Sequence, residues 1–143
     1  MQKMFQLKAN INKGADEEKL QELNKYLSEG WVIKDKDMLH DDKYYATWTF
    51  LLEYSGKHPI NQKIVQLKIH SVDGVDEEQL KELNNYLSEG WNIQSYQSIY
   101  YTESQSMRNG ICVLRKWELR IIFLERPDEA LKSYEDSTIA ELR

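Results

Sequence analysis

The sequence predicts an α+β protein of two tandem β-α-β-β repeats, a mainly antiparallel sheet with helices on one face. Its main support is an internal repeat at an offset of 60, where residues 14–33 and 74–93 are identical at 15 of 20 positions. Period-two alternation precedes each repeated segment and a helical leucine spacing lies within it. A unit of this size buries little apolar surface alone, so we expect the repeats to share a core about a pseudo-twofold axis.

Each repeat is predicted to begin with a strand and continue with a helix. Asp16 and Asp76 precede two glutamates each, which suits a helix N-cap, and Gln79 has capping-box spacing from Asp76. The strands alternate apolar with polar residues, and each helix carries leucines at i, i+3 and i+7. The apolar strand positions are Phe5, Leu7, Ala9 and Ile11, then Val65, Leu67 and Ile69; the leucines are Leu20, Leu23 and Leu27, then Leu80, Leu83 and Leu87.

Each helix is predicted to end at Gly30 or Gly90 in a left-handed conformation, with Trp31 or Trp91 packing back on the last turn. A hairpin follows, over residues 32–39 and 44–54 in the first repeat and roughly 92–103 and 111–124 in the second.

The second hairpin is longer by about nine to twelve residues, depending on whether Trp117 or the Phe-Leu-Glu ending is matched to the first repeat. We interpret Trp48 and Trp117 as equivalent. Asn109-Gly110 is a type I′ turn signal. A two-residue turn there would place Tyr100 opposite Leu119 and Tyr101 opposite Glu118.

The chain divides into three parts: 1–60 is the first repeat with its linker, 61–126 the second repeat with the enlarged hairpin, and 127–143 an acidic tail. The tail has five acids and two bases, and forms a short amphipathic helix or stays mobile. Both repeats are nearly neutral, so the net charge of −5 says little about a partner of the folded body.

Composition excludes several classes of protein. No apolar run approaches the roughly 20 residues of a membrane helix, and no signal peptide is evident. The single cysteine, Cys112, allows neither an intrachain disulfide nor a multi-cysteine zinc cluster, which fits the cytoplasm. The mildly acidic balance argues against general nucleic-acid binding. We therefore predict a cytoplasmic protein without membrane or general nucleic-acid contacts.

The search for catalytic and metal-binding patterns gives no candidate. The chain has no P-loop, dinucleotide fingerprint, nucleophile elbow, zinc-protease motif or EF-hand loop. His40, His58 and His70 lack metal-site spacing, and Cys112 between Ile111 and Val113 is read as a small core residue. The Asp-Glu-Glu clusters are explained as helix starts. We predict that the protein is not an enzyme and uses no cofactor or metal.

The segments LNKYLSEGW and LNNYLSEGW, each after an acidic helix start and before a strand, resemble the helix end of a family of short bacterial and phage domains of unknown function. The resemblance covers about 45 residues of each repeat. It departs at Val32 and Asn92, where the family has glutamate, and in the enlarged hairpin. It implies a β-α-β-β fold and a bacterial or phage origin, and no catalytic residue.

Duplication does not explain the arginine and tyrosine content of the second hairpin. The first repeat has nine lysines and no arginine, whereas the second has four arginines. Guanidinium groups bind phosphate or carboxylate in a bidentate manner, and tyrosines stack on bases or contact proteins. We expect a non-enzymatic protein that senses or sequesters a small anionic ligand, such as a nucleotide signal, through Tyr100, Tyr101, Arg108 and Arg115.

The family's occurrence in phages suggests one concrete form of such a binder, a sponge for a host signal. The alternative is a protein-interaction or assembly module that engages a protein partner or forms a homo-oligomer through its sheet and long second hairpin.

Overall fold

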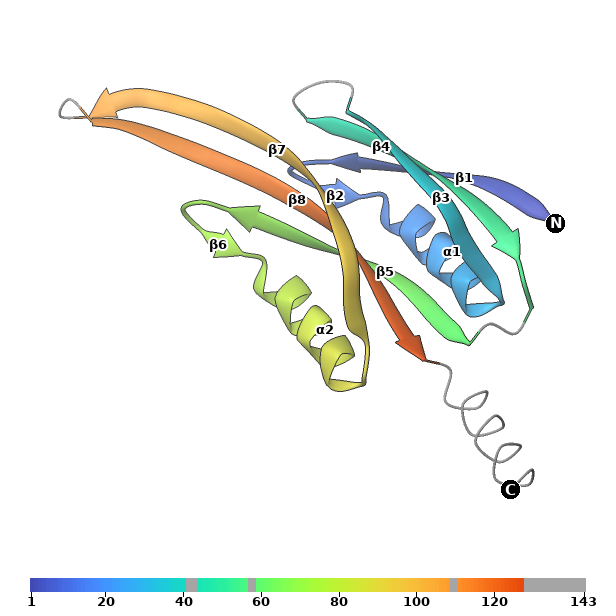
Figure 1. The fold of residues 1–143 in the computed structure, drawn as a ribbon. Helices are drawn as coiled ribbons and strands as arrows, with labels where there is room; N and C mark the ends of the chain where they lie inside the picture. The colour runs from blue at the N-terminus through green and yellow to red at the C-terminus, as the bar shows by residue number, and fades with distance from the viewer. Residues whose placement is uncertain (41–43, 57–58, 109–110, 128–143) are drawn as a thin grey trace.

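A computed structural model describes residues 1–40, 44–56, 59–108 and 111–127, of which 104–108 and 111–113 are described by their backbone alone. The predicted turns over 41–43 and at Asn109-Gly110, and the tail over 128–143, lie outside these residues. Figure 1 shows two successive repeats with the same element order.

Both repeats have the element order β-β-α-β-β, in which a two-residue strand that the sequence did not predict precedes each helix. The first consists of β1 (Gln2–Asn10), β2 (Gly14–Ala15), α1 (Glu17–Ser28), β3 (Trp31–His40) and β4 (Tyr45–Tyr54). The second consists of β5 (Ile60–His70), β6 (Gly74–Val75), α2 (Glu77–Ser88), β7 (Asn92–Arg108) and β8 (Ile111–Pro127).

Each repeat forms its own antiparallel four-stranded sheet, in the orders β2-β1-β4-β3 and β6-β5-β8-β7. The predicted α+β class with two tandem repeats is therefore confirmed, with two sheets in place of one.

The helix boundaries follow the predicted capping signals. The side chain of Asp16 accepts a hydrogen bond from Lys19 N, and that of Asp76 accepts one from Gln79 N. The predicted reciprocal bond of a capping box does not form, because Gln79 Oε1 accepts from Lys68 N at 2.7 Å. The N–H of Asp76 donates to Lys68 O, so both polar groups are satisfied by the adjacent strand.

The helix ends are also as predicted. Gly30 and Gly90 have φ values of 101° and 94°, in the left-handed region that glycine adopts without a steric penalty. The tryptophan after each glycine packs on the last helical turn, with Trp31 6.0 Å from the ring of Tyr26 and Trp91 6.5 Å from that of Tyr86.

The strand register decides how the two hairpins correspond. Phe5 lies opposite Phe50 in the first sheet, and Val65 opposite Ile122 in the second. The Phe-Leu-Glu ending is thus the correct match, and the second hairpin is longer by twelve residues. The equivalence of Trp48 and Trp117 is wrong: Trp48 pairs with Leu7, and its equivalent is Arg120, which pairs with Leu67.

The register of the long hairpin is also shifted by one residue from the prediction. Tyr100 lies opposite Glu118 and Tyr101 opposite Trp117. The cause is an irregularity between Gln105 and Arg108, where β7 has one residue more than the facing part of β8.

The repeats pack in succession rather than through reciprocal surfaces. The helix α1 lies against β5 of the second repeat, and its Leu23 and Leu27 share one core with Ile64 and Ile121 of the second sheet. The helix α2 packs on the opposite face of that sheet, where Leu83 and Leu124 form a second core. The second sheet therefore has α1 on one face and α2 on the other, and α2 forms an outer layer of the molecule (Figure 1).

This packing differs from the predicted pseudo-twofold arrangement. A twofold axis would require α2 to contact the first sheet as α1 contacts the second, but α2 packs mainly on β5 of its own repeat. The physical reason is that each repeat has one apolar face, which carries its helix. The first repeat binds with this face to the side of the second sheet that lies away from α2.

Candidate functional site

The structure does not bring the four predicted ligand-binding residues together. Side chains alternate between the two faces of a strand, so Tyr100 and Tyr101 point to opposite sides of the second sheet. Tyr100 is exposed on the face that carries α2, whereas Tyr101 and Arg115 lie on the face toward the first repeat. The side chain of Arg108 lies outside the described residues.

Tyr101 belongs to an aromatic contact between the two hairpins. Its ring is 4.9 Å from that of Tyr44 and 5.3 Å from that of Trp117. The hydroxyls of Tyr44 and Tyr101 are hydrogen-bonded at 3.3 Å, and this hydrogen bond raises the pKa of Tyr101 to about 12 because it favours the protonated phenol. Arg115 lies on the same face with its Nε buried and no hydrogen-bond partner among the described residues. These contacts join the repeats.

The junction between the repeats is made by α1 and the open edge of β5. β6 pairs with β5 only at Ile69 and His70, so no described strand pairs with this edge of β5 near Ile64. There the side-chain amide of Asn24 pairs with both backbone groups of Ile64, as donor and as acceptor, at 2.8 Å each.

Two glutamines of β5 extend this contact. Gln62 Oε1 accepts from Ile33 N at 2.9 Å and Gln66 Oε1 accepts from Ala15 N at 2.7 Å. With Asn24 they form a polar frame around Ile64, which is 1% exposed.

Aromatic side chains complete the junction beyond the helix. Trp48 is fully buried, and its Nε1 donates to Gln97 Oε1 at 2.7 Å. Lys36 Nζ lies 3.6 Å from the ring centroid of Phe123 and donates to Ser95 Oγ at 3.0 Å. Burial at this contact lowers the pKa of Lys36. The helix-bearing face of the first repeat is thus occupied along its length by the second repeat.

The same face of the second repeat is uncovered among the described residues. Leu87 is 37% exposed, whereas its equivalent Leu27 is 4% exposed. The amide of Asn84 has no hydrogen-bond partner within the described part of the chain, whereas its equivalent Asn24 binds β5. We call this surface the open face; it consists of Leu80, Asn84 and Leu87 on α2, Tyr96 and Tyr100 on β7, and Arg120 on β8.

The open face is more polar than its covered counterpart. Arg120 replaces the buried Trp48 of the first repeat, and its Nε donates to Glu118 Oε2. The guanidinium also lies 4.8 Å from the ring centroid of Tyr96. The hydrogen bond to Glu118 raises the pKa of Arg120. Among the described residues only its Nε is engaged, so the terminal N–H groups of the guanidinium are available as donors.

A cleft of about 310 Å³ lies between the repeats, lined by β3, β5, β7 and β8. Lys34, Lys36 and Lys63 contribute positive charge, and Asp35 and Glu125 contribute negative charge. Lys34 pairs with Glu53 at 3.3 Å, and Lys63 lies 4.2 Å from the ring centroid of Tyr86. Burial lowers the pKa of Lys63. Of the predicted residues whose side chains are described, Tyr100, Tyr101 and Arg115, none lines this cleft.

A wider groove of about 600 Å³ runs between α1 and α2, with β5 as its floor. Its walls carry several carboxylates, including Glu17, Glu78 and Glu82, which disfavours an anionic ligand there. No group of three or more potential metal ligands occurs among the described residues. Over the same ranges, no helix combines the length and apolar character needed to cross a membrane.

Sequence reasoning missed the residues that join the repeats. Asn24 and Asn84 were read only as part of the helix motif, and the glutamines only as part of the repeat. One signal was present: Gln2, Met4 and Gln6 recur with the same spacing as Gln62, Ile64 and Gln66. Repetition of polar residues on the solvent side of a strand indicates a repeated contact, which core packing does not require.

The chain was also compared with known proteins. No family model matches it, and no curated protein and no solved structure is significantly similar to it.

Proposed function

We propose that the chain is a non-enzymatic protein-interaction module that binds a protein partner through the open face. The observation that supports this function is the difference between two equivalent surfaces. The first repeat uses its helix-bearing face to hold the second repeat. On the same face of the second repeat, Asn84 has no hydrogen-bond partner within the described ranges and Leu87 is 37% exposed.

The chemistry of the open face suits a protein partner. An asparagine amide pairs with a strand edge as donor and acceptor, as Asn24 does with Ile64. Tyrosine and arginine are enriched at protein interfaces because they combine apolar area with hydrogen bonding.

The function is tested with a photo-cross-linking amino acid at position 84, introduced into the chain in its source cells. We expect a cross-linked protein product from position 84 and none from position 85. The control residue, Asn85, is also exposed on α2, and its equivalent Lys25 is exposed, whereas Asn24 binds β5. Absence of a product from position 84 in a folded chain would refute the function.

A second candidate function is binding of a small anion in the cleft between the repeats. The observation that favours it is the presence of Lys34, Lys36 and Lys63 around a volume of about 310 Å³. Calorimetric titration with a panel of nucleotides is the test. Binding that is lost in Lys36→Met and kept in the exposed control Lys25→Met would support it, and no heat with any nucleotide would refute it.

A further inference from the structure

We propose that the partner of the open face is a second copy of this chain, which docks head to tail through the outer face of its first repeat. This inference rests on the proposed interaction function and names its partner. The outer face is the side of the first sheet away from α1, and consists of Gln2, Met4 and Gln6 on β1 with Asp35 and Asp37 on β3.

The strand β1 repeats the three contact positions of β5. Gln2, Met4 and Gln6 occupy the places of Gln62, Ile64 and Gln66 in equivalent strands. Met4 is 63% exposed, whereas Ile64 is 1% exposed. Because β2 pairs with β1 only at Ala9 and Asn10, the edge of β1 near Met4 is as open as the edge that Asn24 binds in β5.

The second repeat in turn contains the groups that would receive such a strand. Asn84 and the backbone N–H groups of Val75 and Ile93 occupy the places of Asn24, Ala15 N and Ile33 N. Gly74 leaves room for the incoming glutamine: a Cβ built there would meet nothing within 4 Å, whereas one on Gly14 would collide with the side chain of Gln66. The space beside Gly14 is thus filled by Gln66 at the junction, whereas the space beside Gly74 on the open face holds no described atom within 4 Å.

The polar substitutions on the two faces are complementary in charge. At the junction Trp48 donates to Gln97, and Lys36 donates to Ser95. The equivalent donors on the open face are Arg120 and Tyr96, and the equivalent acceptors on the outer face are Asp37 and Asp35. If a second copy docks on the open face as the second repeat docks on the first, the guanidinium of Arg120 faces the carboxylate of Asp37. The phenol of Tyr96 then faces the carboxylate of Asp35.

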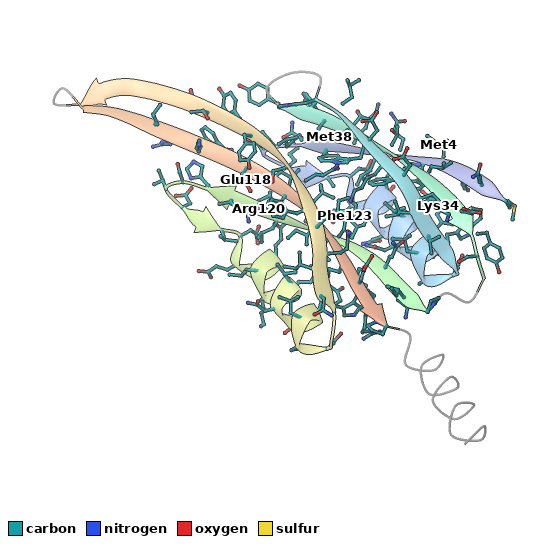
Figure 2. All side chains as sticks on the ribbon, viewed as in Figure 1. Met4, Lys34, Met38, Glu118, Arg120 and Phe123 are labelled. Carbon is teal, nitrogen blue, oxygen red and sulfur yellow. The ribbon has the colours of Figure 1, made fainter. Side chains whose placement is uncertain are left out.

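Two different surfaces take part in this contact. Met4 and Arg120 lie far apart on the molecule, on β1 and β8 (Figure 2). Each chain can therefore offer both faces at once, and copies add in one direction, as in a heterologous interface. The contact replaces the buried Trp48 with Arg120 and the buried Ile121 with Thr49. Because charged and polar groups stand where the junction has apolar ones, the contact is reversible and weakens with salt.

The test uses two variants of the full chain, each of which blocks one face. Asn84→Asp removes the amide donor and adds a charge on the open face, and Met4→Glu places a charge on the outer face. Asn85→Asp is the matched control, with the same charge on the solvent side of α2. Sedimentation velocity over a range of protein concentrations measures association, and circular dichroism verifies the fold of each variant.

We expect wild type and Asn85→Asp to associate with increasing concentration, and each blocked variant to associate at least about tenfold more weakly. An equimolar mixture of Asn84→Asp and Met4→Glu retains one intact face of each kind, so it forms a dimer and nothing larger. A wild-type chain that stays monomeric at all concentrations would overturn the inference, as would a mixture that does not pair.

Mass spectrometry of the product cross-linked from position 84 separates the two proposals. A link to residues 1–10 of another copy supports head-to-tail docking. A link to a different polypeptide overturns the identity of the partner but keeps the interaction function. A link to residues 128–143 of the same chain overturns both, because the open face would then be covered by its own tail.

Discussion

The helices α1 and α2 are nearly identical in sequence but differ in what they contact. Both begin at an aspartate cap and end before a left-handed glycine. In α1 the buried residues are Leu23 and Leu27, whereas in α2 only Leu83 is buried. The local sequence thus determines where each helix forms, while the neighbouring repeat determines whether the side of the helix away from its own sheet is buried.

The largest expected difference concerns the equivalent positions 48 and 120. Trp48→Ala opens a cavity at a fully buried site and is expected to lower the free energy of unfolding by about 3–5 kcal/mol. Arg120→Ala, on the open face, is expected to lower it by about 1 kcal/mol or less. Denaturant unfolding of the two variants measures both values; similar losses would mean that the second position is also part of a buried core.

A smaller difference is expected for the asparagines of the two helices. Asn24→Ala leaves the N–H and C=O of Ile64 without partners and is expected to lower the free energy of unfolding by about 1–3 kcal/mol. Asn84→Ala is expected to change it by less than about 0.5 kcal/mol under conditions where the chain is monomeric. Thermal unfolding of dilute protein provides the comparison, and an equal loss for both would contradict an open face on α2.

Substitution of the helix caps should have the same effect in both repeats. Asp16→Ala and Asp76→Ala each delete one hydrogen bond to a backbone N–H in the first turn. We expect each to lower the free energy of unfolding by about 1 kcal/mol. Asp76 also pairs with Lys68 of β5 at 3.9 Å, but a partly exposed ion pair of this length contributes little. The two losses should therefore agree within about 0.5 kcal/mol, and a larger difference would show that tertiary contacts also act on the caps.

The smallest effect concerns the contact between Tyr44 of the first hairpin and Tyr101 of the second. Because the hydrogen bond between the hydroxyls of Tyr44 and Tyr101 raises the pKa of Tyr101 to about 12, the folded chain holds this proton at pH values where the unfolded chain, near the ordinary value of 10, has lost it. Stability is therefore expected to fall with rising pH across this window. Tyr101→Phe should remove this part of the pH dependence, as measured by denaturant unfolding at alkaline pH.

A spectrophotometric titration checks the same assignment in the folded state. The tyrosine that Tyr101→Phe removes from the titration curve should be one that ionises near pH 12. Loss of a group that ionises near pH 10 would mean that the contact between the hairpins does not persist in solution.

Much of each repeat was predictable because its signals are local. Alternation predicted the strands, and Asp16 and Gly30 predicted where α1 begins and ends, since caps satisfy backbone groups within one turn. The order of the sheets was not predictable, and neither was the register of the long hairpin. One additional residue between Gln105 and Arg108 moves Tyr101 from Glu118 to Trp117, and a bulge leaves no clear mark in the sequence.

The candidate site was predicted less well than the fold. Tyr100, Tyr101, Arg108 and Arg115 stood out because duplication does not explain them, but adjacent tyrosines on a strand point to opposite faces. Asn84 did not stand out, because the first repeat has the same asparagine, Asn24, in the same motif. Its exposure depends on the absence of a third repeat beyond α2 among the described residues.

The sequence by itself determined the two β-α-β-β units, their caps and their apolar faces, because these follow from backbone hydrogen bonding and side-chain periodicity over a few residues. Only the tertiary structure decided that the helix-bearing face of the first repeat binds the back of the second. Two such faces cannot both be covered when the repeats pack in succession. The second helix therefore has an exposed leucine and an asparagine without a partner in the part of the chain that the structure describes, where the first has a buried contact.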